Sequence, residues 1–346
     1  MTALHEEQHL TDAVNSVFAQ DYLGTVELVV AVGPSQDRTR DIAEDLAAHE
    51  PRMTVVDNPT GRTPAGLNLA IAATDPATRI IVRTDGHAQL PPGYIRMAVE
   101  SLVRTGAANV GGMMVPDGVT PFECAVARAM SEPIGLGSVS FHVGGAEGPA
   151  PTVYLGVFRR SILEATGGFN EHFTRAQDWE LNHRIRETGA AVWFDPRLQV
   201  CYRPRSSISG LAKQFYGSGT WRWQIIRAYP HTASLRYLAA PVATLALGVA
   251  ALSLVVNTAV VHSTVVGVVA LAVPVSYLVL VAVGCAVSRR GLDMAASAWY
   301  PVCVVTMHLS WGTGFLTAAL RDAARALVSR LPANRAGRPR LRADAA

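Results

Sequence analysis

Two acidic side chains, far apart in the sequence, stand where a site for a phosphorylated substrate would need them. Asp85 follows an apolar run in the stretch IVRTDGHA, and Asp178 lies in the stretch RAQDWELNHRIR, residues 175–186. One carboxylate at such a site can hold a divalent cation on a diphosphate, and another can accept a proton from an attacking hydroxyl. The pair therefore suggests transfer of a group from a phosphorylated donor to an acceptor.

Each of these side chains also has a purely structural interpretation. Asp85 can be a turn residue or a helix N-cap, and Asp178 and Glu180 can be first-turn acids favoured by the helix dipole. His87 can be a metal ligand or a loop residue. The Gly-Gly-Phe turn at 167–169, shortly before the acidic helix, favours a functional role for Asp178.

Strands alternate with helices through the first 205 residues, which predicts an α/β domain built on a mostly parallel sheet. The strands are predicted at 27–32, 53–56, 79–82, 108–115, 152–158, 190–194 and 198–202, with helical patterns between them. Ligands of such sheets bind beyond the carboxyl ends of the strands. Asp85 directly follows the third of these runs and is placed for that role.

The chain start and one long loop depart from this regular alternation. The first helical pattern begins at residue 6, so residues 1–4 supply only the end of a strand. We expect this first strand to be truncated, or the coding frame to continue upstream into apolar residues that complete it, because an absent strand would expose its neighbour. Residues 132–151, rich in Gly, Ser and Pro, are expected to form a mobile loop over the site.

Apolar residues are concentrated after residue 236. The runs 238–256 and 264–287 are uncharged and long enough to cross a membrane core of ~30 Å. Two crossings return the arginines at 289–290 to the cytoplasm, whereas a third would export an arginine-rich tail, against the positive-inside rule. We therefore expect the uncharged stretch 297–320, which contains proline, histidine and glycine, to be re-entrant or interfacial, although its hydropathy alone indicates a third span.

The remaining segments are assigned from their charge and aromatic content. Residues 206–236 combine tryptophan and arginine in a pattern typical of a membrane interface, and a core helix of the α/β domain is the alternative. The tail, 321–346, holds seven arginines and two aspartates and is expected to lie in the cytoplasm near anionic lipid. Nothing outside that tail indicates binding to nucleic acid. The expected domains are thus 1–205, 206–236, 237–320 and 321–346.

Four stretches together resemble the family 2 glycosyltransferases, and specifically their ExoA-like branch, which is associated with succinoglycan-type exopolysaccharide synthesis. They are LHEE at 4–7, TDGH at 84–87, TVYLGVFRRSILEATGGFNE at 152–171 and QDWEL at 177–181. The resemblance covers about residues 3–225. It implies a GT-A fold, Rossmann-like with a mostly parallel sheet, and an inverting transfer of a sugar from a nucleotide-sugar donor.

The resemblance also implies a role for each acid. Asp85 would be the first acid of the metal-binding Asp-x-Asp of the family, with His87 in place of the second, and the two would hold Mn²⁺ or Mg²⁺ on the donor diphosphate. The metal would stabilise the charge that develops on the leaving diphosphate. Asp178 would be the general base that deprotonates the acceptor hydroxyl.

Further residues are assigned to the two substrates by the same resemblance. The candidate contacts of the nucleotide-sugar are Leu4, Glu6, Val32, Arg62, Asn68 and Asp85. The candidate contacts of the acceptor are Gln177, Trp179, Glu180, Gln214, Arg222 and Trp223. Val32 stands where the family usually carries an acid that contacts the base, so the base stays open. The Gln-x-x-Arg-Trp pattern of processive relatives is present only loosely, so processivity also stays open.

These expectations describe a membrane-anchored glycosyltransferase that moves a sugar to a saccharide or polyprenyl-linked acceptor in envelope or exopolysaccharide synthesis. Its domain would face the cytoplasm, where nucleotide-sugars are made, from a multi-pass anchor in the plasma membrane. One alternative is a catalytically inactive, glycosyltransferase-like scaffold subunit, suggested by the short first strand, Val32 and His87. Another is a nucleotidyltransferase, although the basic, glycine-rich loop that it needs is not visible. Retention of both Asp85 and Asp178 favours the transferase.

Overall fold

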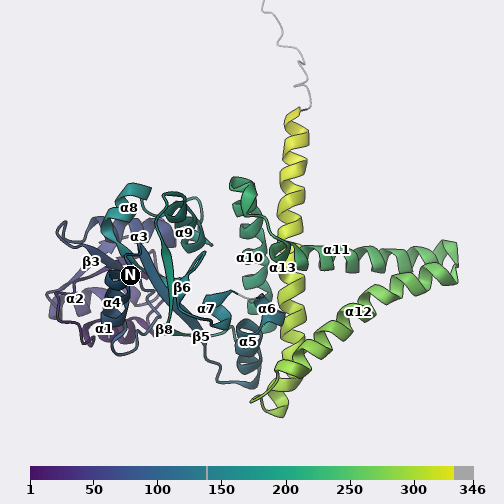
Figure 1. Cartoon of the computed structure of the whole chain (residues 1–346), viewed down its shortest axis with the longest axis horizontal. Helices are drawn as coiled ribbons and strands as arrows, with labels where there is room; N and C mark the ends of the chain where they lie inside the picture. The colour runs from purple at the N-terminus through teal and green to yellow at the C-terminus, as the bar shows by residue number, and fades with distance from the viewer. Residues whose placement is uncertain (138, 331–346) are drawn as a thin grey trace, which may run out of the picture.

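The computed structural model describes residues 1–137 and 139–330, and these are the residues meant below. The larger part of the predicted basic tail, from residue 331 onward, lies outside them. Figure 1 shows an α/β part formed by the first 200 or so residues, followed by long helices that extend to one side of it.

Three parallel strands form one half of the central sheet, in the order β1-β2-β3. They are β1 (Thr2–Ala3), β2 (Leu28–Val32) and β3 (Met53–Asp57). The two-residue strand β1 occupies a central position, because Thr2 pairs with Ala31 of β2 on one side and bridges Asp85 on the other. This bridge connects the two halves of the sheet and places Asp85 at its centre.

Five strands form the other half, in the order β4-β7-β5-β8-β6. They are β4 (Ile80–Val82), β5 (Asn109–Pro116), β6 (Gly148–Pro149), β7 (Tyr154–Arg159) and β8 (Val192–Tyr202). Only β6 and β7 run against their neighbours, so the other strands of both halves share one direction. The prediction of a mostly parallel sheet is therefore confirmed.

Two local predictions in this half are wrong. The strands expected at 190–194 and 198–202 form the single strand β8, because a register shift in β5 lets the pairing continue past the interruption. The shift needs glycine: a Cβ on Gly112 would lie 1.8 Å from the carbonyl oxygen of Leu198. Residues 132–151 are not a plain loop either, since they hold the strand β6 and two short helices, α6 (Pro133–Leu136) and α7 (Ser140–Val143).

Helices pack on the sheet and close the core of the α/β part. They are α1 (Leu10–Phe18), α2 (Thr39–His49), α3 (Thr63–Ala72), α4 (Tyr94–Thr105), α5 (Pro121–Ser131), α8 (Arg160–Thr166) and α9 (Gln177–Glu187). Leu10, Leu102 and Leu155 are fully buried in the core, and each such side chain contributes ~1.5–3 kcal/mol. The one polar atom of buried Tyr94 is satisfied, because its hydroxyl donates to the Leu155 carbonyl at 3.1 Å.

Three helices are long and apolar enough to cross a membrane. The segments after the α/β part are α10 (Ile208–Ala228), α11 (Leu235–Val256), α12 (Thr264–Ser288) and α13 (Met294–Arg330), with a π-helical turn at Asn257–Val261. In Figure 1, α11 and α12 form a hairpin that projects away from the α/β part. Large apolar side chains such as Leu252, Val268 and Leu280 are exposed along it, as expected of helices that face lipid.

The helix α13 differs from this hairpin, because it packs lengthwise on α10 and crosses the start of α11. Glycines permit the close contacts. A Cβ on Gly314 would lie 2.1 Å from the Tyr216 carbonyl oxygen, and one on Gly312 would lie 2.0 Å from Thr244 Oγ1. The glycines of the stretch 297–320 thus serve packing, and the helix runs through them without a break. The expectation of a re-entrant turn is wrong, while the interfacial alternative stays a prediction.

Candidate active site

The side chain of Arg83 joins the two acids found in the sequence. Its Nη1 donates to Asp178 Oδ2 at 2.8 Å, and its Nη2 donates to Asp85 Oδ1 at 2.9 Å. Only 5% of this side chain is exposed. Burial opposes the guanidinium charge, but Asp178 and Asp85 outweigh it and hold the pKa of Arg83 above its usual range. Arg83 is therefore a fixed positive charge that sets the separation of the two carboxylates.

The end of β4 explains how this bridge is held. The backbone N–H of Arg83 donates to the Gly156 carbonyl of β7 at 3.0 Å, so pairing continues one residue beyond Val82. Asp85 then bridges to Thr2, which fixes both side chains at the carboxyl end of a central strand. Arg83 was missed in the sequence, although an arginine directly after an apolar run was a usable signal.

Asp178 lies in the first turn of α9, immediately after a sharp change in chain direction. Ala176 takes up the left-handed conformation there, with φ of 59°. Burial raises the pKa of the Asp178 carboxyl, Arg83 lowers it, and the charge of Asp85 raises it, with a net upward shift. Its Oδ1 is buried without a hydrogen-bond partner in the described part of the chain. A carboxylate with a raised pKa and an open lone pair is suited to general-base work.

Glu180 lies away from Asp178, as its offset of two residues, about 200° around the helix, requires. It is fully buried and accepts hydrogen bonds from Arg184 Nε and from the Tyr229 hydroxyl, both at 2.8 Å. Glu180 therefore fixes α9 to the segment that follows α10 and does not line the space beside Asp178.

His87 and Asp85 have donor atoms suited to a metal. His87 Nδ1 lies 2.7 Å from Glu6 Oε1, and this hydrogen bond raises the pKa of His87 against the effect of burial. When the ring is neutral and Nδ1 donates to Glu6, Nε2 carries the lone pair, an arrangement that commonly orients a metal-bound histidine. Asp85 offers the oxygen that Arg83 leaves free. One carboxylate and one imidazole fit Mn²⁺ better than Mg²⁺, which prefers oxygen throughout.

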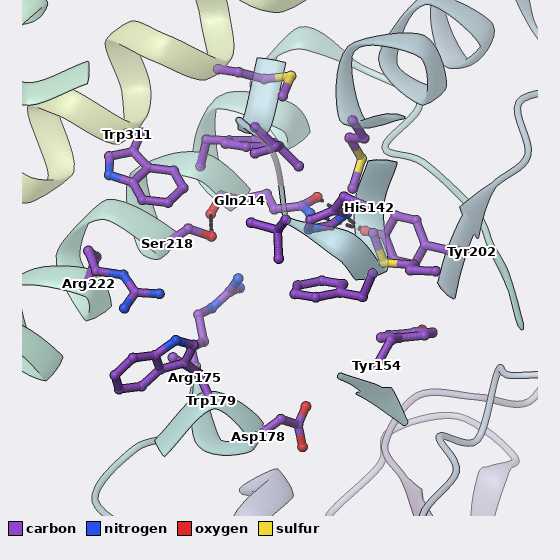
Figure 2. Close-up of a pocket in the computed structure, with 18 of the residues that line it drawn as sticks. His142, Tyr154, Arg175, Asp178, Trp179, Tyr202, Gln214, Ser218, Arg222 and Trp311 are labelled. Atoms are coloured by element: carbon purple, nitrogen blue, oxygen red, sulfur yellow. Dashed lines mark hydrogen bonds between the residues drawn. The ribbon is translucent and has the colours of Figure 1, made fainter. Parts of the chain in front are cut away.

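A cavity of about 950 Å³ extends from these acids towards the long helices. Figure 2 shows Asp178 and Trp179 on the α9 side, and Gln214 and Trp311 across the space from them. Further walls come from α6, α7, α11 and α12. The apolar residues that the membrane-side helices contribute are Ala239, Ala240, Ala243, Leu280 and Met307. The cavity therefore connects the carboxylates with an apolar interior between helices.

One buried charged side chain in this cavity has no acidic partner among the described residues. Arg222 is 9% exposed, and its guanidinium carbon lies 3.8 Å from the Tyr237 ring centroid and 4.8 Å from that of Trp179. Burial lowers its pKa, and its Nη1 has no hydrogen-bond partner among the described residues. A buried cation held only by aromatic rings is costly without an anion. This part of the cavity is therefore suited to a negatively charged ligand.

Residues 1–167 match the model of glycosyl transferase family 2. The chain carries a family 2 glycosyltransferase domain. This glycosyltransferase is 29% identical to the succinoglycan biosynthesis protein ExoA of Rhizobium meliloti (strain 1021) over 312 residues. The aligned residues cover 90% of this chain and 91% of ExoA. The resemblance seen in the sequence is thereby confirmed.

A second relative and one solved structure extend the comparison. The glycosyltransferase is 24% identical over 235 residues to the dolichyl N-acetyl-alpha-D-glucosaminyl phosphate 3-beta-D-2,3-diacetamido-2,3-dideoxy-beta-D-glucuronosyltransferase of Methanococcus voltae, covering 64% of this chain and 71% of the relative. Its fold is similar to that of the mannosyltransferase PcManGT from Pyrobaculum calidifontis, solved with GDP-Man and Mn²⁺. The TM-score is 0.59 at 19% identity, over 93% and 86% of the two chains. The predicted GT-A fold is confirmed.

The cavity of this glycosyltransferase is lined by most of the side chains that the sequence nominated. They are Leu4, Glu6, Asp85, His87, Gln177, Asp178, Trp179, Gln214 and Arg222. Residues that the sequence did not nominate also line it: Arg83, Tyr154, Arg175, Arg236 and Tyr237. The last two precede or begin the apolar run of α11, where a sequence pattern indicates only a membrane boundary.

The other nominated side chains lie outside the cavity lining. Val32 is buried at the end of β2, and Arg62 is exposed at the N-terminus of α3. Asn68 holds the turn before α9, because it donates to the Phe169 carbonyl and accepts from the Phe169 N–H, both at 2.8 Å. Trp223 donates to Asp322 at 2.9 Å and so joins α10 to α13. Asn68 and Trp223, like Glu180, thus have structural contacts that explain them.

Proposed function

We propose that this glycosyltransferase moves a sugar, with inversion, from a nucleotide-sugar to a hydroxyl of a saccharide linked to a lipid phosphate, at the cytoplasmic face of the plasma membrane. The observation that carries the proposal is the course of the cavity, from Asp178 past the unpartnered Arg222 into the apolar space between helices. The Methanococcus voltae relative, whose name specifies a dolichyl phosphate-linked sugar acceptor, supports this choice. The Rhizobium meliloti relative supports a role in exopolysaccharide synthesis.

The donor would occupy the end of the cavity beside the sheet. Asp85 and His87 would hold a divalent cation, Mn²⁺ by their donor set, and Glu6 would orient His87. The bound cation would neutralise charge on the leaving nucleoside diphosphate. The GDP-Man and Mn²⁺ in the PcManGT structure support a nucleotide-sugar donor and a metal.

The transfer itself would be a single displacement assisted by Asp178. The acceptor hydroxyl oxygen attacks the anomeric carbon while its proton passes to the Asp178 carboxylate, and the bond from that carbon to the diphosphate oxygen breaks. Attack from the face opposite the leaving group inverts the configuration. An inactive scaffold would have no use for Arg83, buried between two carboxylates, so the bridge favours an active enzyme over that alternative.

Arg222 provides the test of the acceptor class. We expect Arg222→Gln to raise KM for a polyprenyl-phosphate-linked saccharide acceptor by ~10–100-fold, because a hydrogen bond to a charged group contributes about 1.5–3 kcal/mol. KM for the nucleotide-sugar should stay within about twofold. The measurement is steady-state transfer of radiolabelled sugar in detergent micelles, with each substrate varied in turn.

The matched control is Arg227→Gln, which removes a charge from the same helix at a side chain that pairs with Asp322 and is 59% exposed. Arg227→Gln should leave both KM values unchanged. An Arg222→Gln enzyme that keeps its affinity for the lipid phosphate, or loses affinity equally for an acceptor without phosphate, would show that the acceptor is of another kind.

We further propose that α11 and α12 cross the membrane as a hairpin, while α13 lies along its inner surface. Both ends of the apolar stretch of α13 contact elements outside the hairpin: Trp299 packs edge-on against Phe122 of α5, and Asp322 accepts from Trp223 of α10. If α13 crossed the bilayer, it would draw α5 or α10 in with it. Figure 1 shows α13 running across the base of the hairpin beside α10.

Cysteine labelling in intact cells tests this topology. In a variant without the four native cysteines, a cysteine introduced at His262, in the turn of the hairpin, should react with a membrane-impermeant maleimide. A cysteine at Ala346 should react only after the cells are permeabilised, since two crossings return the chain to the cytoplasm. Labelling at Ala346 in intact cells would establish a third crossing and exclude the surface position of α13.

A further inference from the structure

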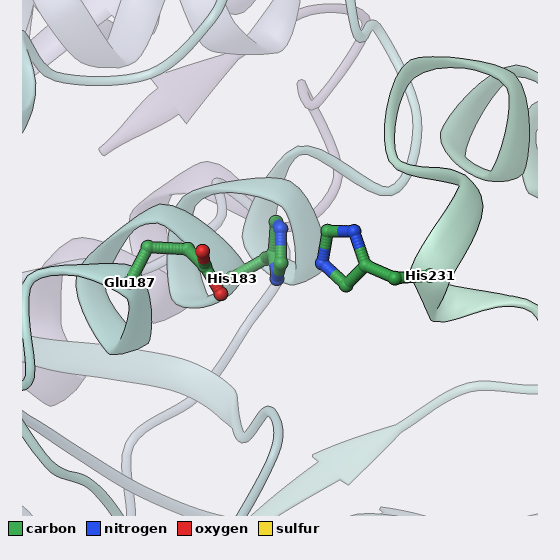
Figure 3. Close-up of side chains that lie close together, drawn as sticks. All are labelled: His183, Glu187 and His231. Atoms are coloured by element: carbon green, nitrogen blue, oxygen red, sulfur yellow. The ribbon is translucent and has the colours of Figure 1, made fainter.

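Three side chains with metal-binding atoms lie close together beside α9, and none of them lines the cavity. His183, Glu187 and His231 each offer one ligand atom, and these three atoms lie within 4.8 Å of one another. No other group of three histidine, cysteine, aspartate or glutamate side chains in residues 1–137 and 139–330 meets this spacing. Figure 3 shows the His183 ring between the Glu187 carboxylate and the His231 ring. His183 lies five residues beyond Asp178, about 140° around the helix from it.

The backbone brings these side chains together from two segments. His183 and Glu187 are four residues apart on α9, so they lie on one face of the helix. His231 comes from the 3-10 turn Pro230–Thr232, which connects α10 to α11. A metal ion bound by all three side chains would therefore connect α9 to the start of the membrane hairpin.

The central ligand is already oriented by aromatic neighbours. His183 is buried, its ring stacks on Trp179 with centroids 5.4 Å apart, and the edge of Tyr229 approaches it at 4.6 Å. Glu187 and His231 are exposed. The three ligand atoms lie at most 4.8 Å apart, and tetrahedral ligands at Zn²⁺ distances lie about 3.4 Å apart.

We propose that His183, Glu187 and His231 form a Zn²⁺ site separate from the donor metal of the transferase. Two imidazoles and one carboxylate, with water in a fourth position, are a ligand set common at Zn²⁺ sites, and such a set binds Zn²⁺ more tightly than Mn²⁺. Glu187 supplies the negative charge. Arg186 approaches His183 Nδ1 only at 3.5 Å, a long contact that a bound cation replaces.

A metal here would act on the active site through two short connections. Trp179 stacks on His183 and also lies under the guanidinium of Arg222 in the cavity wall. Tyr229, which contacts the His183 ring, donates to Glu180, two residues beyond Asp178 on α9. Zn²⁺ would thus fix the helix that carries the base relative to the turn that enters the membrane.

The experiment measures Zn²⁺ binding to the full-length protein in detergent micelles, purified without a polyhistidine tag and stripped with chelator. We expect about one equivalent of Zn²⁺ per chain by equilibrium dialysis with a chromophoric competitor. Co²⁺ in its place should give the visible absorption bands of a tetrahedral site. Affinity should fall at least tenfold in His231→Ala and in Glu187→Gln, since each removes one of three ligands. These two side chains are exposed, so both variants are expected to fold.

Two controls separate this site from other sources of binding. His9→Ala removes an exposed histidine of the α1 N-terminus and should leave the Zn²⁺ affinity unchanged. Asp85→Asn should also retain it, because Asp85 belongs to the donor site. Zn²⁺ affinity that is the same in His231→Ala and Glu187→Gln as in the unsubstituted chain, or lost in Asp85→Asn, overturns the proposal. Failure of glycosyl transfer would leave this measurement intact, since it requires no substrate.

Discussion

Replacing Asp178 with asparagine is expected to lower turnover by ~10²–10⁴ while nucleotide-sugar affinity changes little. Asparagine keeps the size of the side chain and an oxygen that can accept from Arg83, but it cannot take up a proton. Oδ1 has no hydrogen-bond partner among the described residues, so no hydrogen-bonded neighbour is placed to substitute for it. Single-turnover transfer measures the rate of the chemical step, and calorimetry measures the affinity for the nucleotide-sugar.

The pH dependence provides a second readout of the same assignment. Because the pKa of Asp178 is raised, turnover of the unsubstituted enzyme should fall with acidity at a pH above the ordinary aspartate range. The residual activity of Asp178→Asn should lack this acidic limb. Glu180→Gln serves as a control on the same helix: it should lower thermal stability, because Arg184 loses its buried partner, yet retain most of the turnover. Near-normal turnover in Asp178→Asn, or a defect confined to donor binding, would move the base elsewhere.

Replacing Asp85 with alanine is expected to abolish activity through loss of the donor, the opposite of the Asp178 pattern. The carboxylate of Asp85 is fixed at the centre of the sheet, because Asp85 accepts from Arg83 and its backbone bridges to Thr2. Without this carboxylate the cation that neutralises the diphosphate has one protein ligand fewer, and His87 alone is a weak site. Calorimetric titration with a nucleoside diphosphate, with and without Mn²⁺, should show metal-dependent binding in the unsubstituted enzyme and none in Asp85→Ala.

A graded control accompanies this prediction. His87→Ala should raise the Mn²⁺ concentration needed for half-maximal activity and leave some activity at saturation, because Asp85 remains. Excess chelator should abolish the activity of the unsubstituted enzyme, and added Mn²⁺ should restore that activity. Full transfer in chelator would remove the metal from the mechanism and leave Asp85 as a partner of Arg83 only.

The sequence predicted those parts of the site that local patterns specify. An acid after a buried strand and an acid opening a helix after Gly-Gly-Phe are both visible within a few residues, and Asp85 and Asp178 lie where these patterns placed them. The Arg83 bridge joins residues 95 positions apart, and a charge on a strand end gives no sign of its partner. The same limit applies to Arg222 in the cavity wall and to His231 beside α9. The position of each of these side chains depends on how α10 packs against its neighbours. Neither hydrophobic periodicity nor composition specifies that packing.

The glycines of α13 show the same limit from another side. In the sequence, the stretch that contains Gly312 and Gly314 was compatible with a re-entrant segment, which the positive-inside rule favoured over a third crossing. The structure uses their missing side chains for contact with Thr244 and with the Tyr216 backbone, and the helix continues. The sequence does not specify which neighbour packs against a glycine, so it could not distinguish a re-entrant segment from a continuous helix in close contact with its neighbours.

The shared guanidinium of Arg83 has a consequence for the order in which substrates enter. Two carboxylates and one guanidinium leave an excess of one negative charge in a buried space, which repels a bare diphosphate. A diphosphate that arrives already complexed with a divalent cation is electrically neutral and meets no such barrier. The donor should therefore enter as its metal complex, from the aqueous end. If the acceptor enters from the opposite, membrane-side end, as proposed, the two substrates do not compete for one entrance. The kinetics should be sequential, because a single displacement needs both substrates bound.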